Sequence, residues 1–369
     1  MIQQTLAALM LAPALLGAGE GEDSRALTRR LDRQQVASLE LPVGEGTLVV
    51  TPAWGARVMG AYFKGDPLNV FWVPPDFDDQ LPPWWWNKGG TRTWLAPEGS
   101  PKGFFYDRNW ENWDVPSTFD PGHYKPVAPR DGGKAAFETF VLATANDGTK
   151  HRLTLSREFV PVADPADSGV AFVGFKTAHR LRNVGPRALK NEVSLWHLAQ
   201  FRGRSTVVFP LAPGDQVTYT DQFEPTPKER ITVTPEAIFY RVGEPPRYKI
   251  GVPATRSLGR VGAFSLLPDG RLQLVVNRYA VDPKGVYLDK ARNAGDVNGD
   301  AFQSYNHDQD GAQHFFELES HHPAVVLAPG EEQQVDVEYL VYRGDRDRVT
   351  AAGAKLLGVD LSPLGEVAR

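Results

Sequence analysis

The stretch HFFELESH, residues 314–321, shows the period-two alternation of a β-strand that is buried on one side. Successive side chains of a strand point to opposite faces of the sheet. One face is apolar and carries Phe316 and Leu318. The other face is ionisable and carries Glu317, Glu319 and His321. Two carboxylates and an imidazole above an apolar layer indicate either a solvated sheet surface or the floor of a binding groove.

The same alternation recurs along the chain, in stretches such as GTLVVTP, FETFVLAT, RLQLVVNRYAV and QQVDVEYLVYR. These stretches are rich in Val, Phe and Tyr, and the 35 glycines and 30 prolines are spread along the whole chain. Such a pattern predicts many short strands joined by turns. We therefore expect an all-β protein, with one large antiparallel domain over residues 40–345 built as a sandwich of two extended sheets.

Two helical segments flank this expected domain. A polar helix is predicted over 25–36, within an N-terminal segment that spans residues 19–39. The stretch RDRVTAAGAKLLG predicts a second helix, with Gly358 as its C-cap, and residues 346–369 then form a C-terminal helix and tail.

The first residues have the pattern of a signal peptide. An apolar run from Leu6 to Leu16 is followed by small residues and then by acidic sequence. The run is too short to span a membrane and matches the apolar core of a secretory signal, so we expect export with cleavage near Ala18. An amphipathic first helix is the alternative, because residues 1–18 contain no Lys or Arg.

Composition excludes several classes of protein. The net charge of −5, without any long run of Lys or Arg, argues against a nucleic-acid partner. The absence of cysteine excludes disulfides, thiolate nucleophiles and zinc sites of the cysteine type. A mean hydropathy of −0.35 excludes a multi-span membrane protein. The chain also lacks the GxSxG, HExxH, GxxxxGK[ST] and GxGxxG motifs, and we expect no cofactor and no metal.

Residues 84–99, WWWNKGGTRTWLAPEG, hold four of the nine tryptophans among many hydrogen-bonding groups. This mixture suits a concave site for a sugar, which has apolar faces and many hydroxyls. The predicted stacking residues are Trp84, Trp86 and Trp94. The predicted hydrogen-bonding residues are Asn87, Arg92 and Glu98. About half of these rings are expected to be structural, because burying an indole is worth roughly 2–3 kcal/mol.

A second strand, NEVSLWHLAQ, has a comparable polar side. Its polar side carries Glu192, Ser194, Trp196 and Gln200, of which Trp196 and Gln200 are candidate sugar-binding residues. Its apolar side carries Val193, Leu195 and His197.

Three stretches make the chain resemble the galactose mutarotase-like group, which includes the aldose 1-epimerases. LVVTPAWGARVMGAYFKGDPLNVFW is similar to the opening strands of that fold, NKGGTRTWLAPEG to a segment of secreted bacterial relatives, and FELESHHPAVVLAPGEEQQVDVEYLVY to the closing hairpin. The resemblance implies a β-supersandwich and a carbohydrate ligand. It also implies that Glu319 is the base that acts on the anomeric hydroxyl, although the Gln of the family pattern Leu-Glu-x-Gln-x-x-Pro is absent. The nearest match to the family's middle-strand histidine is His197.

If the protein is an enzyme, we expect epimerisation at a sugar carbon, with Glu319 as base and His307 or His321 as acid. Asn306 and His307, in the loop SYNHDQDG, are expected to reach the groove from above, and Glu317 to contact the sugar. Two alternatives stay open: a non-catalytic glycan-binding protein, and a polysaccharide lyase or glycoside hydrolase on the same scaffold. We expect a monomer.

Two patterns bear on metal binding. Adjacent His321 and His322 point to opposite faces of a strand, which argues against a shared metal ion. The stretch DVNGDAFQSYNH begins like a calcium loop, but Ala301 and His307 occupy the places of the Gly and Glu that an EF-hand requires. A calcium site of another kind in residues 296–310 stays open.

Overall fold

The computed structural model describes residues 23–77, 86–106, 112–291, 298–309 and 311–366. Its strands form three sheets, and every strand pairing in these ranges is antiparallel. The antiparallel all-β sandwich expected from the sequence is therefore confirmed. The predicted signal peptide lies outside the described residues. None of the described helices is long and apolar enough to span a membrane.

The largest sheet has ten strands. In spatial order they are β12 (Ile231–Val233), β13 (Ala237–Val242), β10 (Ser205–Pro210), β15 (Arg260–Leu266), β16 (Leu272–Arg278), β19 (Glu332–Gly344), β8 (Ala171–Asn183), β7 (Lys150–Pro161), β6 (Ala135–Thr144) and β5 (Lys125–Val127).

The second sheet has six strands and carries most of the predicted site residues. In spatial order they are β11 (Thr220–Asp221), β14 (Tyr248–Pro253), β17 (Asp300–Asn306), β18 (Phe316–His321), β9 (Ser194–Phe201) and β4 (Thr91–Ala96). The third sheet consists of β1 (Leu39–Val43), β2 (Gly46–Thr51) and β3 (Arg57–Tyr62). Short 3₁₀ turns lie at Pro52–Trp54, Lys228–Arg230, Gly311–Gln313 and Ser362–Glu366.

Aromatic side chains from both large sheets fill the space between them. The Phe71 ring lies 5.4 Å from Phe201 of β9, 6.4 Å from Phe175 of β8 and 6.0 Å from Tyr339 of β19. These four residues are 0–2 % exposed. Burial of a large aromatic side chain is worth roughly 2–3 kcal/mol, so this layer holds the two sheets face to face.

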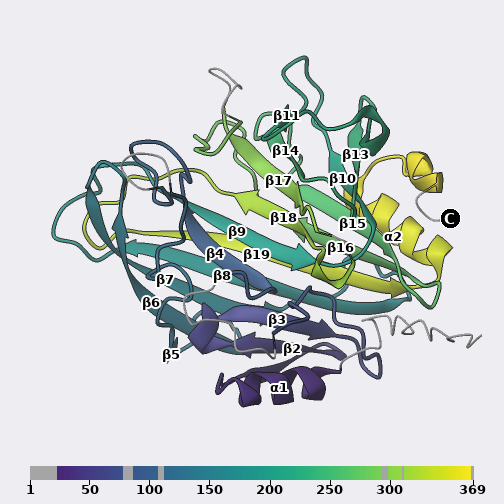
Figure 1. The fold of residues 1–369 in the computed structure, drawn as a ribbon, viewed down its shortest axis with the longest axis horizontal. Coiled ribbons are helices and arrows are strands. Elements are labelled where there is room, and N and C mark those ends of the chain that lie inside the picture. The colour runs from purple at the N-terminus through teal and green to yellow at the C-terminus, as the bar shows by residue number, and fades with distance from the viewer. Residues whose placement is uncertain (1–22, 78–85, 107–111, 292–297, 310, 367–369) are drawn as a thin grey trace, which may run out of the picture.

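Two helices pack against the sheets, one on the three-stranded sheet and one on the ten-stranded sheet (Figure 1). Helix α1 (Ser24–Arg33) packs Leu27 and Leu31 against β2 and β3, and it ends three residues before the predicted Val36. Helix α2 (Arg346–Leu357) packs against β15, β16 and β19. It ends at Gly358, whose φ of 67° is left-handed and favours glycine.

A polar layer lies within the sandwich, beside the aromatic one. His197 of β9 contacts the Tyr339 hydroxyl through Nε2 (2.9 Å) and Thr93 Oγ1 through Nδ1 (3.1 Å). The Thr93 hydroxyl also lies 3.4 Å from His179 Nδ1. Burial, and after it nearby cationic groups, hold the pKa of both histidines well below the usual value. His197 therefore lies between the sheets, as its place on the apolar side of the strand predicts.

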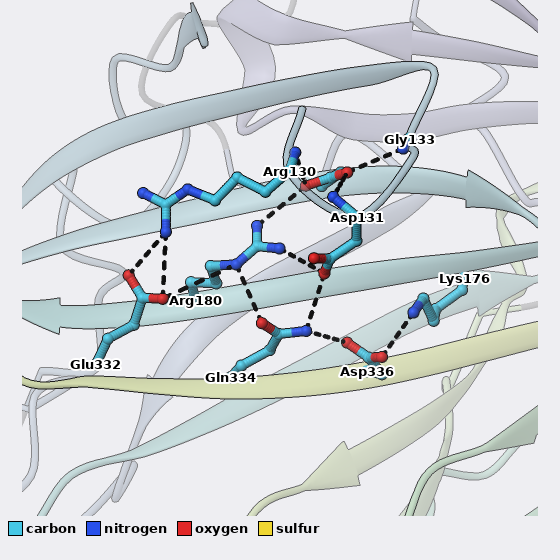
Figure 2. Close-up of polar contacts among 9 residues, drawn as sticks. Arg130, Asp131, Gly133, Lys176, Arg180, Glu332, Gln334 and Asp336 are labelled. Carbon is cyan, nitrogen blue, oxygen red and sulfur yellow. Dashed lines mark hydrogen bonds and ion pairs between the residues drawn. The ribbon is translucent and has the colours of Figure 1, made fainter. Parts of the chain in front are cut away.

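The outer face of the ten-stranded sheet carries an ionic cluster centred on Arg180 of β8 (Figure 2). Its guanidinium donates to Glu158 (3.1 Å), Asp131 (2.5 Å) and Gln334 (3.2 Å). The Glu158 carboxylate also accepts backbone N–H bonds from residues 130, 131 and 133 at 2.7–3.0 Å. This cluster holds the connection between β5 and β6 onto the sheet.

Candidate functional site

The side of the six-stranded sheet that faces away from the sandwich interior gathers polar side chains from five strands. The strand register places Trp94 opposite Trp196, Gln200 opposite Glu317, and Glu319 opposite Gln303. We call this surface the polar face. It comprises Arg92, Trp94, Trp196, Gln200, Lys249, Gln303, Tyr305, Glu317, Glu319 and His321. The residues that alternate with these point to the core between the sheets.

One buried ion pair of the polar face joins the tryptophan-rich segment to strand β18. Arg92 Nη2 donates to Glu317 Oε1 (2.7 Å), and the two side chains are 3 % and 7 % exposed. The same oxygen accepts from Gln200 Nε2 (2.9 Å), which also donates to Asn87 Oδ1 (2.8 Å). Arg92 Nε, Arg92 Nη1 and Gln200 Oε1 are buried without a hydrogen-bond partner among the described residues. Segments more than 200 residues apart in sequence thus meet here.

A second buried ion pair lies beside it. Glu319 Oε2 accepts from Lys249 Nζ (2.9 Å) and from Trp196 Nε1 (2.8 Å). His321 stacks on Trp196 with ring centroids 5.3 Å apart, and its Nε2 lies 3.8 Å from Glu319 Oε2. The other oxygen of this carboxylate, Oε1, has no partner in the described part of the chain.

The charged groups around Glu319 shift one another's pKa values. Burial by itself would raise the pKa of Glu319, but Lys249 and then His321 outweigh burial and lower it to about 2. Burial would lower the pKa of His321, but the carboxylates of Asp289 and Glu319 raise it to about 9. Glu319 is therefore a carboxylate at neutral pH, and it is a weak base.

The turn after β4 meets the segment before β17 at the edge of the polar face. The Glu98 backbone N–H donates to Asp289 Oδ1 (2.9 Å), and Trp113 Nε1 donates to Glu98 Oε1 (2.8 Å). Asp289 Oδ2 lies 3.4 Å from His321 Nδ1. Burial, and after it the neighbouring carboxylates, raise the pKa of Glu98, although Lys249 opposes this. Glu98 thus retains a proton at higher pH than an ordinary glutamate.

The tryptophans divide into two groups. Trp94 and Trp196 are 2 % and 3 % exposed and pack edge to face at 5.2 Å, and the Trp94 indole donates to Asp120 (3.0 Å). Trp86 and Trp113 are partly exposed and lie 5.3 Å apart. The Arg92 guanidinium lies 4.4 Å from the Trp94 ring and 5.3 Å from the Trp86 ring. Trp84 lies outside the described residues.

Two glycines shape the entry into β4. Gly89 and Gly90 have φ of 80° and 67°, and a Cβ on either residue would lie 2.4 Å from a backbone oxygen, that of Trp72 or Val58. At these glycines the backbone closely approaches another part of the protein's own chain, and this holds Trp86 and Asn87 beside the polar face.

Two predicted residues lie away from the centre of the polar face. Asn306 points to the other side of β17, where its amide donates to the backbone oxygens of Glu244 (2.7 Å) and Pro246 (2.9 Å). Its expected position over the groove is therefore wrong, because strand alternation continues through residue 306. His307 lies at the edge, where it stacks on Phe315 at 4.4 Å and contacts the Tyr305 hydroxyl (3.1 Å).

Three ionisable residues of the site do not follow from the sequence patterns: Lys249, Asp289 and Asp300. Lys249 stands alone among apolar residues in YKIGV, and its alternation with Tyr248 and Ile250 was the available signal. Asp300 lies in the stretch that resembles a calcium loop, but its Oδ2 accepts from Gln222 (2.8 Å) and Gln303 (2.9 Å). No group of His, Asp or Glu in the described ranges is arranged to hold a metal ion.

The fold defines the class of protein to which this chain is similar, the galactose mutarotase-like β-supersandwich. A galactose mutarotase-like protein from Lactobacillus casei matches with a TM-score of 0.51 and 10% identity, over 83% of this chain and all of that one. The Slr1438 protein of Synechocystis matches with a TM-score of 0.51 and 13% identity, over 83% of this chain and 96% of that one. A putative aldose 1-epimerase from Escherichia coli matches with a TM-score of 0.50 and 12% identity, over 83% of this chain and 99% of that one.

The chain belongs to a family described as a family of unknown function, DUF6786, whose model matches residues 22–368. A search of the curated proteins found no match.

Proposed function

We propose that this protein binds a saccharide on the polar face. One observation carries the proposal: buried donors and acceptors without a partner among the described residues converge there. The donors are two nitrogens of Arg92, and the acceptors are Gln200 Oε1 and Glu319 Oε1. A buried polar group without a partner costs about 1–3 kcal/mol, and a sugar hydroxyl both donates and accepts, so a polyol satisfies groups of both kinds.

The tryptophans support the same class of ligand. Trp86 and Trp113 flank the ion pairs and keep part of their surface exposed. Indole faces stack on the C–H groups of sugars, while the neighbouring amide and guanidinium groups bind hydroxyls. The mutarotase-like fold supports a carbohydrate-related scaffold.

Proton transfer to the bound sugar is a second proposed property. Three carboxyls of the site are held in different states: Glu319 is ionised, while the pKa values of Glu98 and Asp300 are raised. Carboxyls whose environments separate their pKa values are the usual arrangement for acid–base chemistry on sugars. We propose that this chemistry is epimerisation at the anomeric carbon.

Titration calorimetry with a panel of neutral and acidic monosaccharides tests the binding. Gln200→Leu removes one unpartnered acceptor and one donor to Glu317, and we expect it to raise the Kd about tenfold. Gln216→Leu, in an exposed loop, is the matched control and should leave the Kd unchanged. If neither the wild type nor the control variant binds a sugar of the panel, the proposal is contradicted.

Activity assays then separate the kinds of saccharide-binding protein. Polarimetry of freshly dissolved sugars should show faster approach to the anomeric equilibrium. Binding without faster exchange indicates a glycan-binding protein. New ultraviolet absorbance on a uronate polysaccharide indicates a lyase and contradicts epimerisation.

A further inference from the structure

A β-bulge turns Asp300 onto the polar face. Strands β14 and β17 pair residue by residue from Tyr248 to Val252, where the register shifts, so that Pro253 lies opposite Asp300. Strict alternation would point Asp300 to the core, together with Phe302. The bulge instead lays the carboxyl over Gly251, where a Cβ would lie 1.9 Å from Asp300 Oδ2. Bulges commonly re-aim a side chain in this way beside functional sites.

The carboxyl of Asp300 is buried without a cationic partner. It is 1 % exposed, and no Lys, Arg or His of the described chain lies within ion-pair distance of it. Both of its hydrogen bonds come from neutral amides, those of Gln222 and Gln303, and both end on Oδ2. Oδ1 has no partner among the described residues. This arrangement fits a neutral carboxylic acid in which Oδ2 is the carbonyl oxygen and Oδ1 carries the proton.

The contrast with the other two carboxyls of the polar face is clear. Glu317 is paired with Arg92, and Glu319 is paired with Lys249. Burial raises the pKa of Asp300 to about 7, although Gln303, His321 and Lys249 oppose this. Gln303, the register partner of Glu319, donates to Asp300, so the acid and the ionised carboxylate lie on either side of one side chain.

We infer that Asp300 is the acid of the polar face and that its Oδ1 proton passes to an oxygen of the saccharide bound there. This inference rests on the proposed function. With a cyclic hemiacetal, the proton moves to the ring oxygen as the bond from that oxygen to C1 breaks. The electron pair of the broken bond stays on the ring oxygen. The C1 hydroxyl oxygen supplies the pair that makes C1=O, and its proton passes to Glu319 Oε1.

A weak base suffices for the second transfer. As the C1=O bond forms, the C1 hydroxyl becomes a protonated carbonyl, which is a far stronger acid than a carboxylic acid. An ionised Glu319 therefore accepts its proton. Closure of the ring on the other face of the carbonyl reverses both transfers. It returns the proton from Glu319 to the sugar and the ring-oxygen proton to Asp300, so no co-reactant is consumed.

Polarimetry of α-D-glucose and α-D-galactose with the full chain tests this inference, between about pH 5 and pH 8 because general acids work best near their own pKa. We expect the protein-dependent rate to fall as pH rises through neutrality. Asp300→Asn should lower it about 10²-fold or more, the usual size for loss of a general acid, and should remove the pH dependence. The Kd from calorimetry should change less than about threefold, because the isosteric amide keeps the packing. Asp269→Asn, the same substitution in an exposed turn, should behave as wild type.

A measurement on the wild type covers the case in which Asp300→Asn does not fold. Carbon-13 NMR of labelled aspartate carboxyls should show Asp300 titrating near neutrality, and a midpoint in the ordinary range near 4 overturns the inference. Rapid exchange that survives in Asp300→Asn overturns it as well. Saccharide binding by the wild type without any acceleration overturns the role of Asp300 and leaves the binding proposal intact. Absence of binding overturns both.

Discussion

Removing Lys249 should leave the Glu319 carboxylate buried without its main partner. The Lys249 and Glu319 side chains are 11 % and 0 % exposed, and Nζ lies 2.9 Å from Oε2. Lys249→Met keeps the length and packing of the side chain and removes the charge. Breaking a buried pair from one side costs about 3–5 kcal/mol, because the remaining charge has no compensation.

The pKa of Glu319 leads to the same magnitude. The folded protein lowers it from 4.5 to about 2. At 1.36 kcal/mol for each pKa unit, this net lowering, in which Lys249 and then His321 outweigh burial, corresponds to about 3 kcal/mol. Because the folded pKa is depressed, the contribution is complete above pH 4.5 and disappears as pH falls towards 2. The cost of Lys249→Met should therefore be largest at neutral pH and should shrink in acid.

Equilibrium unfolding in urea measures this free energy. At neutral pH, Lys249→Met should lose about 3 kcal/mol, and adding Glu319→Gln should restore most of the loss. Lys176→Met is the matched control, since Lys176 bonds Asp336 at 2.7 Å on the outer face of the large sheet with side chains 21 % and 38 % exposed. It should cost less than about 1 kcal/mol. Equal costs for the two lysines, or no recovery in the double variant, would refute the reasoning.

Three further changes have defined outcomes. The pKa of Asp300 rises from 3.8 to about 7 on folding, so the wild type loses stability as pH rises through this range. In urea unfolding, Asp300→Asn should therefore be more stable than wild type by up to about 4 kcal/mol at pH 8. At pH 4 it should be no more stable than wild type. Gly90→Ala places a Cβ 2.4 Å from a backbone oxygen at a φ of 67° and should lower the unfolding free energy by roughly 2–4 kcal/mol; an unchanged thermal midpoint would contradict this. Glu158→Gln removes the charge that binds Arg180 and three backbone N–H groups. Hydrogen exchange should then speed up at residues 130–133, while amides of the core strands stay protected.

The sequence predicts the fold well because the decisive patterns are local. Period-two alternation identifies β18 and β9, and Gly358 marks the end of α2 through its left-handed φ. The pairing of strands is not local. The order of the ten-stranded sheet joins β10 to both β13 and β15, and β19 to β8, and no short-range pattern specifies such neighbours.

The site is predictable to the extent that alternation decides it. Because strands β4, β9 and β18 are regular, the same rule that assigns Glu317, Glu319 and His321 to one face also brings Arg92 to them. Asp300 escapes the rule, since a bulge reverses its direction, and Asp289 escapes it because it lies in a connection without alternation. Sequence patterns also do not reveal charge pairing, which lowers the pKa of Glu319, the predicted base.

The histidines between the sheets determine how the molecule responds to mild acid. Burial keeps the pKa of His179 and His197 far below normal, and burial followed by the charge of His321 lowers that of His322 to about 3. These interior rings therefore take up a proton only at lower pH than an ordinary histidine does. The carboxyls of Glu98 and Asp300, whose pKa values are raised, lie outside the sandwich interior, so the molecule separates a framework that resists protonation from two carboxyls that take up protons more readily.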